Sequence, residues 1–462
     1  MNPWVALACL LAAQLLWLLF TRWLGTRGVK PEMSRKAFHS GQGALLLTMP
    51  LLFGGEIGPV LVWGALSLTA LAVMLLSPGL RQRAAGNVYA VGRISYGDLY
   101  FVIGVVLLFF FASSTYYTYA VPLTMLSFAD ATSALVGKRF GRHKFEAAEG
   151  RKSIEGSLAF FAVAFIAAIA WAPTLPKADM LQVVLIAVIL GLVVMLLEAI
   201  SWRGLDNLLI PLGGFLLLRT YLMMDVSLLL INLAVITMLV VFAVAWRRRS
   251  TLNHSALITG ALFAYTSWTV AGAVWTEGKM GAVGVAWLAP PLLLFLLYNL
   301  LIAPRLIEEH HEKHSVDSVL SAMFAGALWL YLAFYLKRPE LIWPYCAAFA
   351  CVTTNMYFER RMTRRLGTVV FLGIATGSAV ILLIGLGMLH IIDAENTLAL
   401  AQQLGVCAAG AVLAALFVRL GVNALLSEET DKRWRWHVRG LAALAGSVVA
   451  ALPLLGWAVT PA

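Results

Sequence analysis

The chain has 462 residues, of which 61% are hydrophobic and only 12% are charged, and its mean hydropathy is +0.86. A soluble domain has no room to bury that much apolar surface, so the composition excludes an ordinary soluble enzyme and predicts an all-α polytopic membrane protein. The net charge of +11 does not indicate nucleic-acid binding, because the basic residues are concentrated in every second loop between the apolar runs.

Apolar runs of roughly 16–24 residues predict about sixteen membrane-spanning helices. In chain order the predicted spans are 3–20, 38–53, 57–77, 95–112, 118–136, 154–172, 180–199, 205–220, 226–246, 254–274, 281–303, 316–336, 342–358, 367–390, 398–420 and 438–460. Two of these, 38–53 and 205–220, are short enough to tilt, re-enter or break. A basic turn at 246–250 divides the chain into a first domain, 1–250, of about nine helices and a second, 251–462, of about seven.

The basic residues predict an orientation for these helices. Alternate loops contain only Lys177, Arg219, Lys279, Lys337 and Arg338, and the other Lys and Arg residues lie in or beside the remaining loops. The positive-inside rule then places every basic loop in the cytoplasm and both termini outside. The first apolar run has no basic residue before it, which is typical of an N-out anchor and not of a cleaved signal peptide.

Asp130 is the most informative residue, because it lies inside an apolar helix. A carboxylate at membrane depth costs about 2.5–3.5 kcal/mol even on the insertion scale, which favours a functional role. Asp130, Ser133 and Gly137 share one helix face by their spacing. Asp98, at the start of another span, is interpreted instead as a favourable charge at a helix N-terminus.

A basic, glycine-containing loop follows Asp130 and is typical of phosphate binding. Cations hold phosphate through charge-assisted hydrogen bonds, and glycines allow a close backbone approach. With the first cytoplasmic loop and the helix that follows it, the predicted nucleotide- and phosphate-binding set is Gly137, Lys138, Gly141, Arg142, Lys144, Arg151, Lys152, Ser153, Arg35, Lys36 and His39.

Acidic residues at helix ends of the same predicted leaflet complete the set that phosphoryl transfer needs. Mg²⁺ commonly takes one or two carboxylates together with substrate phosphates. The candidate metal ligands are Asp130, Asp206, Asn207 and Glu198, and the candidate catalytic residues are Asp130, Asp206 and Glu155.

Four ordered motifs over residues 32–211 resemble the polyprenol kinase family, which includes phytol, farnesol and dolichol kinases and is related to the membrane phosphatidate cytidylyltransferases. They are Glu32-x-x-Arg35-Lys36-x-x-His39-x-Gly41; Asp130 with the basic segment 137–144; Lys152-Ser153-x-Glu155-Gly156-Ser157; and Glu198-x-x-Ser201-x-x-Gly204-x-Asp206-Asn207-x-x-x-Pro211. The resemblance implies an integral membrane kinase that uses CTP or another NTP with Mg²⁺ to phosphorylate the hydroxyl of an isoprenoid alcohol. It also implies an active site at the cytoplasmic face of the inner membrane.

The second domain is only weakly similar to a membrane family that includes phytyl-phosphate kinases. It reads Thr353-Thr354-Asn355 where an aspartate-containing signature is expected, which predicts an accessory or diverged unit. Two alternatives to a kinase stay open. One is CTP-dependent cytidylyl transfer onto a lipid phosphate, and the other is a non-catalytic lipid transporter or assembly factor on the same scaffold.

Overall fold

A computed structural model of the chain describes part of its length. The described residues are 2–76, 97–112, 115–147, 150–175, 179–201, 204–247, 250, 252–274, 287–288, 291–292, 296, 316–336, 338, 341–359 and 440–451. Contacts divide the chain into two units, Met1–Ile236 and Thr237–Ala462. The functional division proposed at residue 250 stays a prediction.

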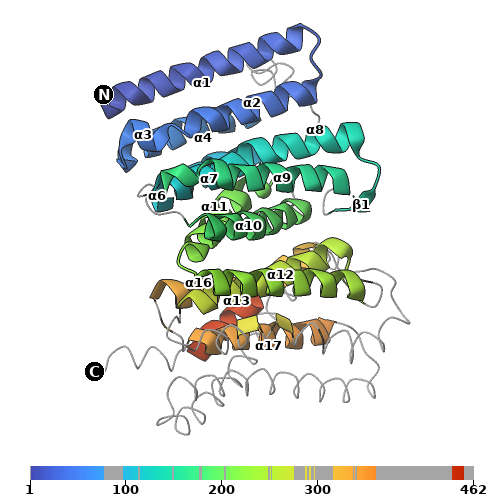
Figure 1. The fold of residues 1–462 in the computed structure, drawn as a ribbon. Helices are drawn as coiled ribbons and strands as arrows, with labels where there is room; N and C mark the ends of the chain where they lie inside the picture. The colour runs from blue at the N-terminus through green and yellow to red at the C-terminus, as the bar shows by residue number, and fades with distance from the viewer. Residues whose placement is uncertain are drawn as a thin grey trace, which may run out of the picture. The chain divides into compact units, whose positions relative to one another are not determined.

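The helices of the first unit follow most of the predicted spans, and the last of them, α12, continues past Ile236, where the unit ends (Figure 1). Their bounds are α1 Pro3–Thr26, α2 Pro31–Leu46, α3 Met49–Phe53, α4 Ile57–Leu76, α6 Gly97–Ala112, α7 Tyr116–Thr124, the π-helix η2 Met125–Ala129, α8 Asp130–Phe140, α9 Ile154–Ala170, the short 3₁₀ turn η3 Ala172–Thr174, α10 Met180–Ile200, α11 Asp206–Tyr221 and α12 Val226–Trp246. Six helical stretches of the described residues, α1, Ile57–Met74, Tyr116–Phe140, Ile154–Thr174, α10 and α12, are long and apolar enough to cross a membrane. These findings agree with an all-α membrane protein, whereas the number sixteen stays a prediction.

The short span predicted at 38–53 does break. Helix α2 begins earlier than predicted, at Pro31, and ends at Leu46, and α3 carries the chain on to a cap at Gly54, whose φ is +57°. Proline is well placed in the first turn of a helix, where its missing N–H is not needed. The early start places the whole first motif, from Glu32 to Gly41, on a helix and not in a loop.

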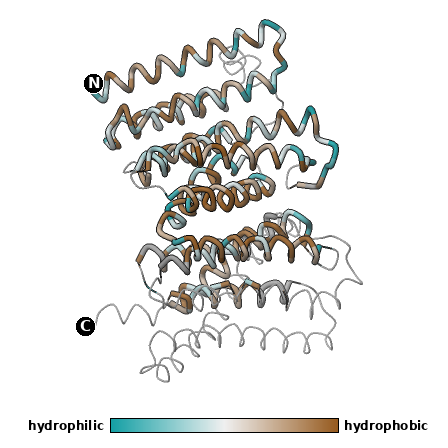
Figure 2. Tube along the Cα trace, in the orientation of Figure 1, coloured by the Kyte–Doolittle hydropathy of each residue, from teal (hydrophilic) through white to brown (hydrophobic). Residues whose placement is uncertain are grey.

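The core of the first unit lies along α10. In the most apolar stretch of α10, 67% of the residues are buried, against 22% in that of α1. Helix α10 packs on α9 and α11, α8 packs on α9, and α11 packs on α6. Figure 2 shows the same pattern, with apolar residues along the middle of these helices and hydrophilic residues at the turns.

The basic loop after α8 contains a feature that the all-α prediction did not include. Strands β1, Lys144–Glu146, and β2, Arg151–Ser153, pair antiparallel with Phe145 opposite Lys152. Since neighbouring side chains on a strand point to opposite faces, Lys152 points away from Arg151. The hairpin thus sorts the cations of this loop into inward and outward sets.

The second unit is described in part, by α13 His254–Val274, α16 Val316–Leu336, α17 Ile342–Glu359 and residues 440–451. Helix α16 packs on both α13 and α17. The buried Tyr345 hydroxyl donates to the Trp287 carbonyl at 2.8 Å and lies 3.0 Å from Ser267 Oγ. The predicted spans 367–390 and 398–420, most of 281–303, and the side chains of Thr353, Thr354 and Asn355 lie outside the described residues.

Candidate active site

The polar residues of α2 form one continuous stripe. Glu32, Arg35 or Lys36, and His39 are spaced three or four apart, so they lie along one face of the helix. Glu32 accepts a hydrogen bond from Arg35 at 2.9 Å and lies 3.7 Å from Lys138 of α8. Charge therefore joins the first turns of α2 to the end of α8.

The centre of this stripe is an ion pair between α2 and α8. Lys36 Nζ lies 2.6 Å from Asp130 Oδ2, and the two side chains are only 8% and 16% exposed. An ion pair removed from water holds its geometry only where hydrogen bonds and packing support it. The intramembrane carboxylate singled out from the sequence thus has a buried cation as its partner.

A π-helical turn supports Asp130 from the preceding residues. Pro122 in α7 cannot donate a backbone hydrogen bond, and the chain widens into η2 just before Asp130. Such single π-turns are frequent at functional sites. Side chains of α2 reach two carbonyls of this turn: Ser40 Oγ donates to Ser127 O at 2.8 Å, and His39 Nε2 lies 3.3 Å from Leu126 O.

A second, partly buried pair joins the hairpin to α10. Lys152 Nζ lies 2.7 Å from Glu198 Oε1 and also donates to the Glu198 carbonyl at the end of α10. A cation at a helix C-terminus is favourable, because the last carbonyls are unpaired and the dipole is negative there. The inward-pointing lysine of β2 thus fixes the hairpin against the helix core.

Asp206 lies between the two pairs. It opens α11, and Asp130, Glu198, Lys36 and Lys152 are all near enough to act on its charge. Residues far apart in the sequence, from α2, α8, β2, α10 and α11, therefore converge on one region of the first unit. The catalytic and metal-binding roles of these residues stay predictions.

Buried polar atoms that lack a partner are concentrated in this region. In the described part of the first unit they are Ser34 Oγ, Arg35 Nε, Glu198 Oε2, Ser201 Oγ and Asp206 Oδ1. Buried polar groups are nearly always hydrogen-bonded, and an unpaired one costs about 1–3 kcal/mol. Both donors and acceptors are among these atoms, as expected of a site that binds a polar ligand.

This region offers a divalent cation few protein ligands. No group of three or more metal-ligating His, Cys, Asp or Glu side chains occurs among the described residues. Mg²⁺ needs only one or two protein carboxylates when phosphates supply the other ligands. Asp206, whose Oδ1 is buried and unpaired, fits this role, whereas Lys36 neutralises Asp130.

Three of the predicted site residues make local structural contacts. Glu155 accepts from the His143 backbone N–H at 3.1 Å and lies 2.8 Å from its Nδ1. The Ser153 side chain is the N-cap of α9 and accepts from Gly156 N at 3.1 Å. Asn207 turns its amide to the Gly204 carbonyl at 3.3 Å.

Glu155 is not brought beside Asp130. Helix α9 meets α8 at Gly137, where an added Cβ would lie 3.0 Å from Ser153 Oγ and 3.7 Å from the Gly156 Cα. Gly137 is seven residues beyond Asp130 along α8, which corresponds to about 10 Å at 1.5 Å per residue. The structure therefore gives Gly137 a role in helix packing and places Glu155 toward the end of the helix. Gly141 likewise packs against Ser153, whose Cβ would lie 2.7 Å from an added Cβ.

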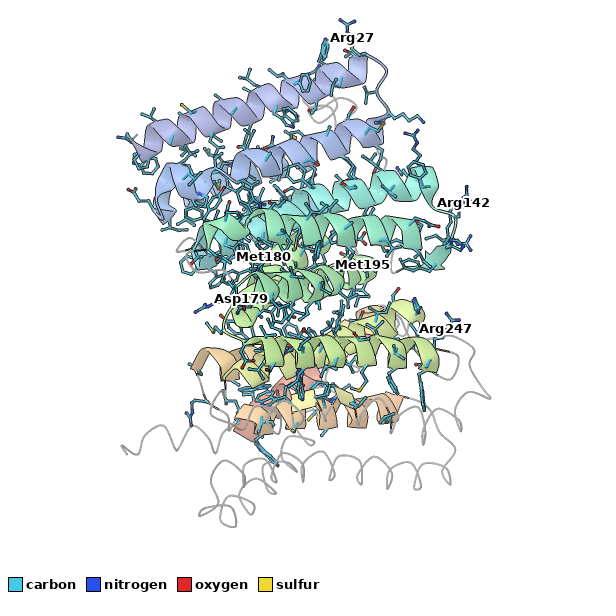
Figure 3. All side chains as sticks on the ribbon, viewed as in Figure 1. Arg27, Arg142, Asp179, Met180, Met195 and Arg247 are labelled. Carbon is cyan, nitrogen blue, oxygen red and sulfur yellow. The ribbon has the colours of Figure 1, made fainter. Side chains whose placement is uncertain are left out.

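The outward-facing cations of the predicted set are exposed at one end of the unit. Lys138, Arg142, Lys144 and Arg151 are all exposed. In Figure 3, Arg142 beside the hairpin and Arg27 after α1 lie at one end of the helices, and Asp179 and Met180 lie at the other. These exposed cations are therefore accessible to an anion in solution.

Asp98 is a member of this region that the sequence interpretation missed. It is half-buried at the start of α6 and acts on the charges of Arg35 and His39. One turn further along α6, Phe101 packs its ring 4.9 Å from that of His39. The only signal in the sequence was an acidic residue beside an apolar span, which also fits a simple helix-end charge.

Comparison with known proteins gives one informative relative. A phytol kinase of Synechocystis sp. (strain ATCC 27184 / PCC 6803 / Kazusa) is 30% identical over 193 residues, which are 40% of this chain and 78% of the relative. No family model matches the chain, and no solved structure matches it. The match extends over a segment of this chain. Through that segment the chain belongs to the phytol kinase family.

Proposed function

We propose that the chain transfers the γ-phosphoryl group of a nucleoside triphosphate, CTP or another NTP, to the hydroxyl of a membrane isoprenoid alcohol such as phytol, farnesol or a longer polyprenol. The observation that carries the proposal is the convergence of two lysine–carboxylate pairs on Asp206. The phytol kinase relative supports the reaction class.

Each part of the site matches a need of phosphoryl transfer, in which positioning and charge stabilisation provide most of the catalysis. Lys36 supplies buried and Lys152 half-buried positive charge, and the exposed cations of the loop attract the triphosphate. Asp206 would hold Mg²⁺, with Asp130 and Glu198 next to it. The metal would neutralise charge on the phosphates. In the proposed orientation this end of the unit faces the cytoplasm, where the nucleotide is available.

The alcohol reaches the site from the bilayer. Its apolar chain stays in the hydrocarbon, and only its hydroxyl has to enter the polar region at the ends of α2 and α8. The buried Lys36–Asp130 pair lies where the apolar and the charged parts of these two helices meet. This arrangement suits a lipid acceptor and a water-soluble donor.

The test uses the full chain in lipid nanodiscs with Mg²⁺, a series of C15 to C55 prenols, and nucleotides labelled at either the α or the γ phosphorus. We expect label from the γ position in a prenyl phosphate. Label from the α position in a lipid phosphate acceptor would identify cytidylyl transfer instead. Binding of a prenol without consumption of any nucleotide would favour the transporter or assembly role and overturn the proposal.

A further inference from the structure

His39 has a contact that a phosphate-binding histidine does not need. Its Nε2 lies 3.3 Å from the carbonyl oxygen of Leu126, inside the π-turn that precedes Asp130. A carbonyl oxygen only accepts hydrogen bonds, so this contact requires the N–H of the ring to be at Nε2. In the neutral ring, Nδ1 then carries a free lone pair and is a hydrogen-bond acceptor.

The surroundings fix this ring in place. Phe101 of α6 packs against it with ring centroids 4.9 Å apart, and the next residue, Ser40, binds the neighbouring carbonyl of the same π-turn. The histidine is thus held on two sides, by a ring and by a backbone carbonyl. Orientation by a second group is what a catalytic base requires.

The charges around His39 come from three helices. Among the described residues, Lys36 on its own helix, Asp130 from α8 and Asp98 from α6 act on it. Helix α1 faces this part of α2 with Trp17, whose indole N–H donates to the Ala37 carbonyl at 3.2 Å. The two carboxylates favour an imidazolium formed during the reaction, whereas burial of the ring and the charge of Lys36 oppose it.

The order of groups along α2 gives this histidine a distinct position. Glu32, Lys36 and His39 follow one another from the charged end of the helix inward. His39 is three residues, about 4.5 Å of helix rise, further from that end than Lys36. A hydroxyl arriving from the bilayer therefore meets His39 at the level where the phosphate-binding charges end.

We propose that His39 Nδ1 is the proton acceptor for the prenol hydroxyl, an inference that rests on the proposed kinase function. The hydroxyl proton passes to Nδ1 while the hydroxyl oxygen forms a bond to the γ-phosphorus. The bond between that phosphorus and the β–γ bridging oxygen breaks, and the nucleoside diphosphate leaves with its electron pair. The imidazolium later returns the proton to water. With His39 as the proton acceptor, Asp130 is left to balance Lys36 and Asp206 to bind metal.

The experiment measures kcat/KM of the full chain in nanodiscs between pH 5 and 9, with γ-labelled nucleotide and saturating Mg²⁺. A histidine that must be neutral to accept a proton produces an acid limb with unit slope. We expect this limb in the native chain. We expect His39→Gln to lower kcat by about 10²–10⁴-fold and to remove the limb. Glutamine retains an amide N–H for the Leu126 carbonyl, so the π-turn keeps a donor.

Ser40→Ala is the matched control, because it removes a neighbouring hydrogen bond to the same π-turn without removing a proton acceptor. A loss of kcat in Ser40→Ala as large as that in His39→Gln would show that anchoring of the turn matters, and would overturn the proposal. A native profile without an acid limb would overturn it whether or not the variants fold. So would a His39→Gln enzyme that retains the limb or activity within a few-fold of the native chain. If the native chain transfers no phosphate at all, the proposed function fails before this inference is tested.

Discussion

Lys36 and Asp130 lie 94 positions apart in the sequence, and their Nζ and Oδ2 atoms are 2.6 Å apart in a region that water scarcely reaches. The pair fastens the first motif-bearing helix to the helix that carries the intramembrane carboxylate. It is therefore both a structural link between α2 and α8 and the centre of the proposed site.

Lys36→Met tests whether the pair links α2 to α8. The substitution leaves the Asp130 carboxylate buried without its cation, and loss of one partner of a buried pair costs about 3–5 kcal/mol. We expect a large fall in the thermal unfolding temperature in detergent. The double variant Lys36→Met with Asp130→Asn removes both charges and should recover much of the stability but no kinase activity. Equal unfolding temperatures for the single variant and the native chain would contradict the buried pair.

Asp206→Asn should have the opposite effect on stability. Asp206 Oδ1 is buried without a hydrogen-bond partner among the described residues, and Asp130 and Glu198 add like charge nearby. A neutral amide removes that repulsion, so we expect an unfolding temperature equal to or above that of the native chain. Phosphorylation should fall by about 10²-fold or more, because the charge serves the reaction and not the fold. Asp130→Asn is the matched comparison, since it should lower both stability and activity.

A rise in activity, or a loss of stability, in Asp206→Asn would remove this residue from the proposed role. A metal titration gives a second readout. The native chain should show Mg²⁺-dependent protection against unfolding in the presence of nucleotide, and Asp206→Asn should show less.

Much of the first unit could be predicted from hydropathy alone. Spans such as 180–199 and 226–246 match α10 and α12 within a residue or two, because long apolar runs have no other stable state in a bilayer. The charged start of α2 could not be found in this way. Residues 31–37 include the polar residues Glu32, Ser34, Arg35 and Lys36 and so form no apolar run. The helix there depends on Pro31 at its first position and on contacts with α1 and α8.

The candidate site was predictable in its members but not in its pairings. The predicted spans place Lys36, Asp130 and Lys152 near helix ends. Which lysine pairs with which carboxylate depends on how each helix is rotated about its own axis. The π-turn before Asp130 changes that rotation, and Pro122 is its only visible sign in the sequence. The hairpin was missed because its strands have only three residues each and few β-branched side chains.

Glu32 provides a test of stability against pH. It precedes the predicted span 38–53, and burial works to raise its pKa, but the hydrogen bond and charge of Arg35 and the charge of Lys138 outweigh burial and lower the pKa. The folded state therefore holds this proton less tightly than the unfolded state. The stabilisation is present above the unfolded pKa of about 4.3 and is lost as pH falls through the lower folded value.

We therefore expect the native chain to unfold at a higher temperature than Glu32→Gln at pH 7, and the difference to shrink as the pH falls below about 5. Unfolding temperatures across this range in detergent measure it. Glu56→Gln, at an exposed carboxylate between α3 and α4, controls for the general effect of losing one negative charge. A difference that stays constant down to pH 3, or that grows in acid, would contradict the ion pairs assigned to Glu32.

Gly137→Ala distinguishes helix packing from phosphate approach as the reason for this glycine. A Cβ at Gly137 would lie 3.0 Å from Ser153 Oγ, and Ser153 is buried and fixed as the N-cap of α9. Overpacking at such a contact costs about 1–3 kcal/mol, so we expect a lower unfolding temperature.

Gly58→Ala is the control. It lies in the first turn of α4 with no described atom within 4 Å of an added Cβ, and alanine there should be neutral or stabilising by up to about 1 kcal/mol. Should Gly137→Ala unfold like the native chain yet bind nucleotide more weakly, the backbone at this position serves the phosphate and not the contact between α8 and α9.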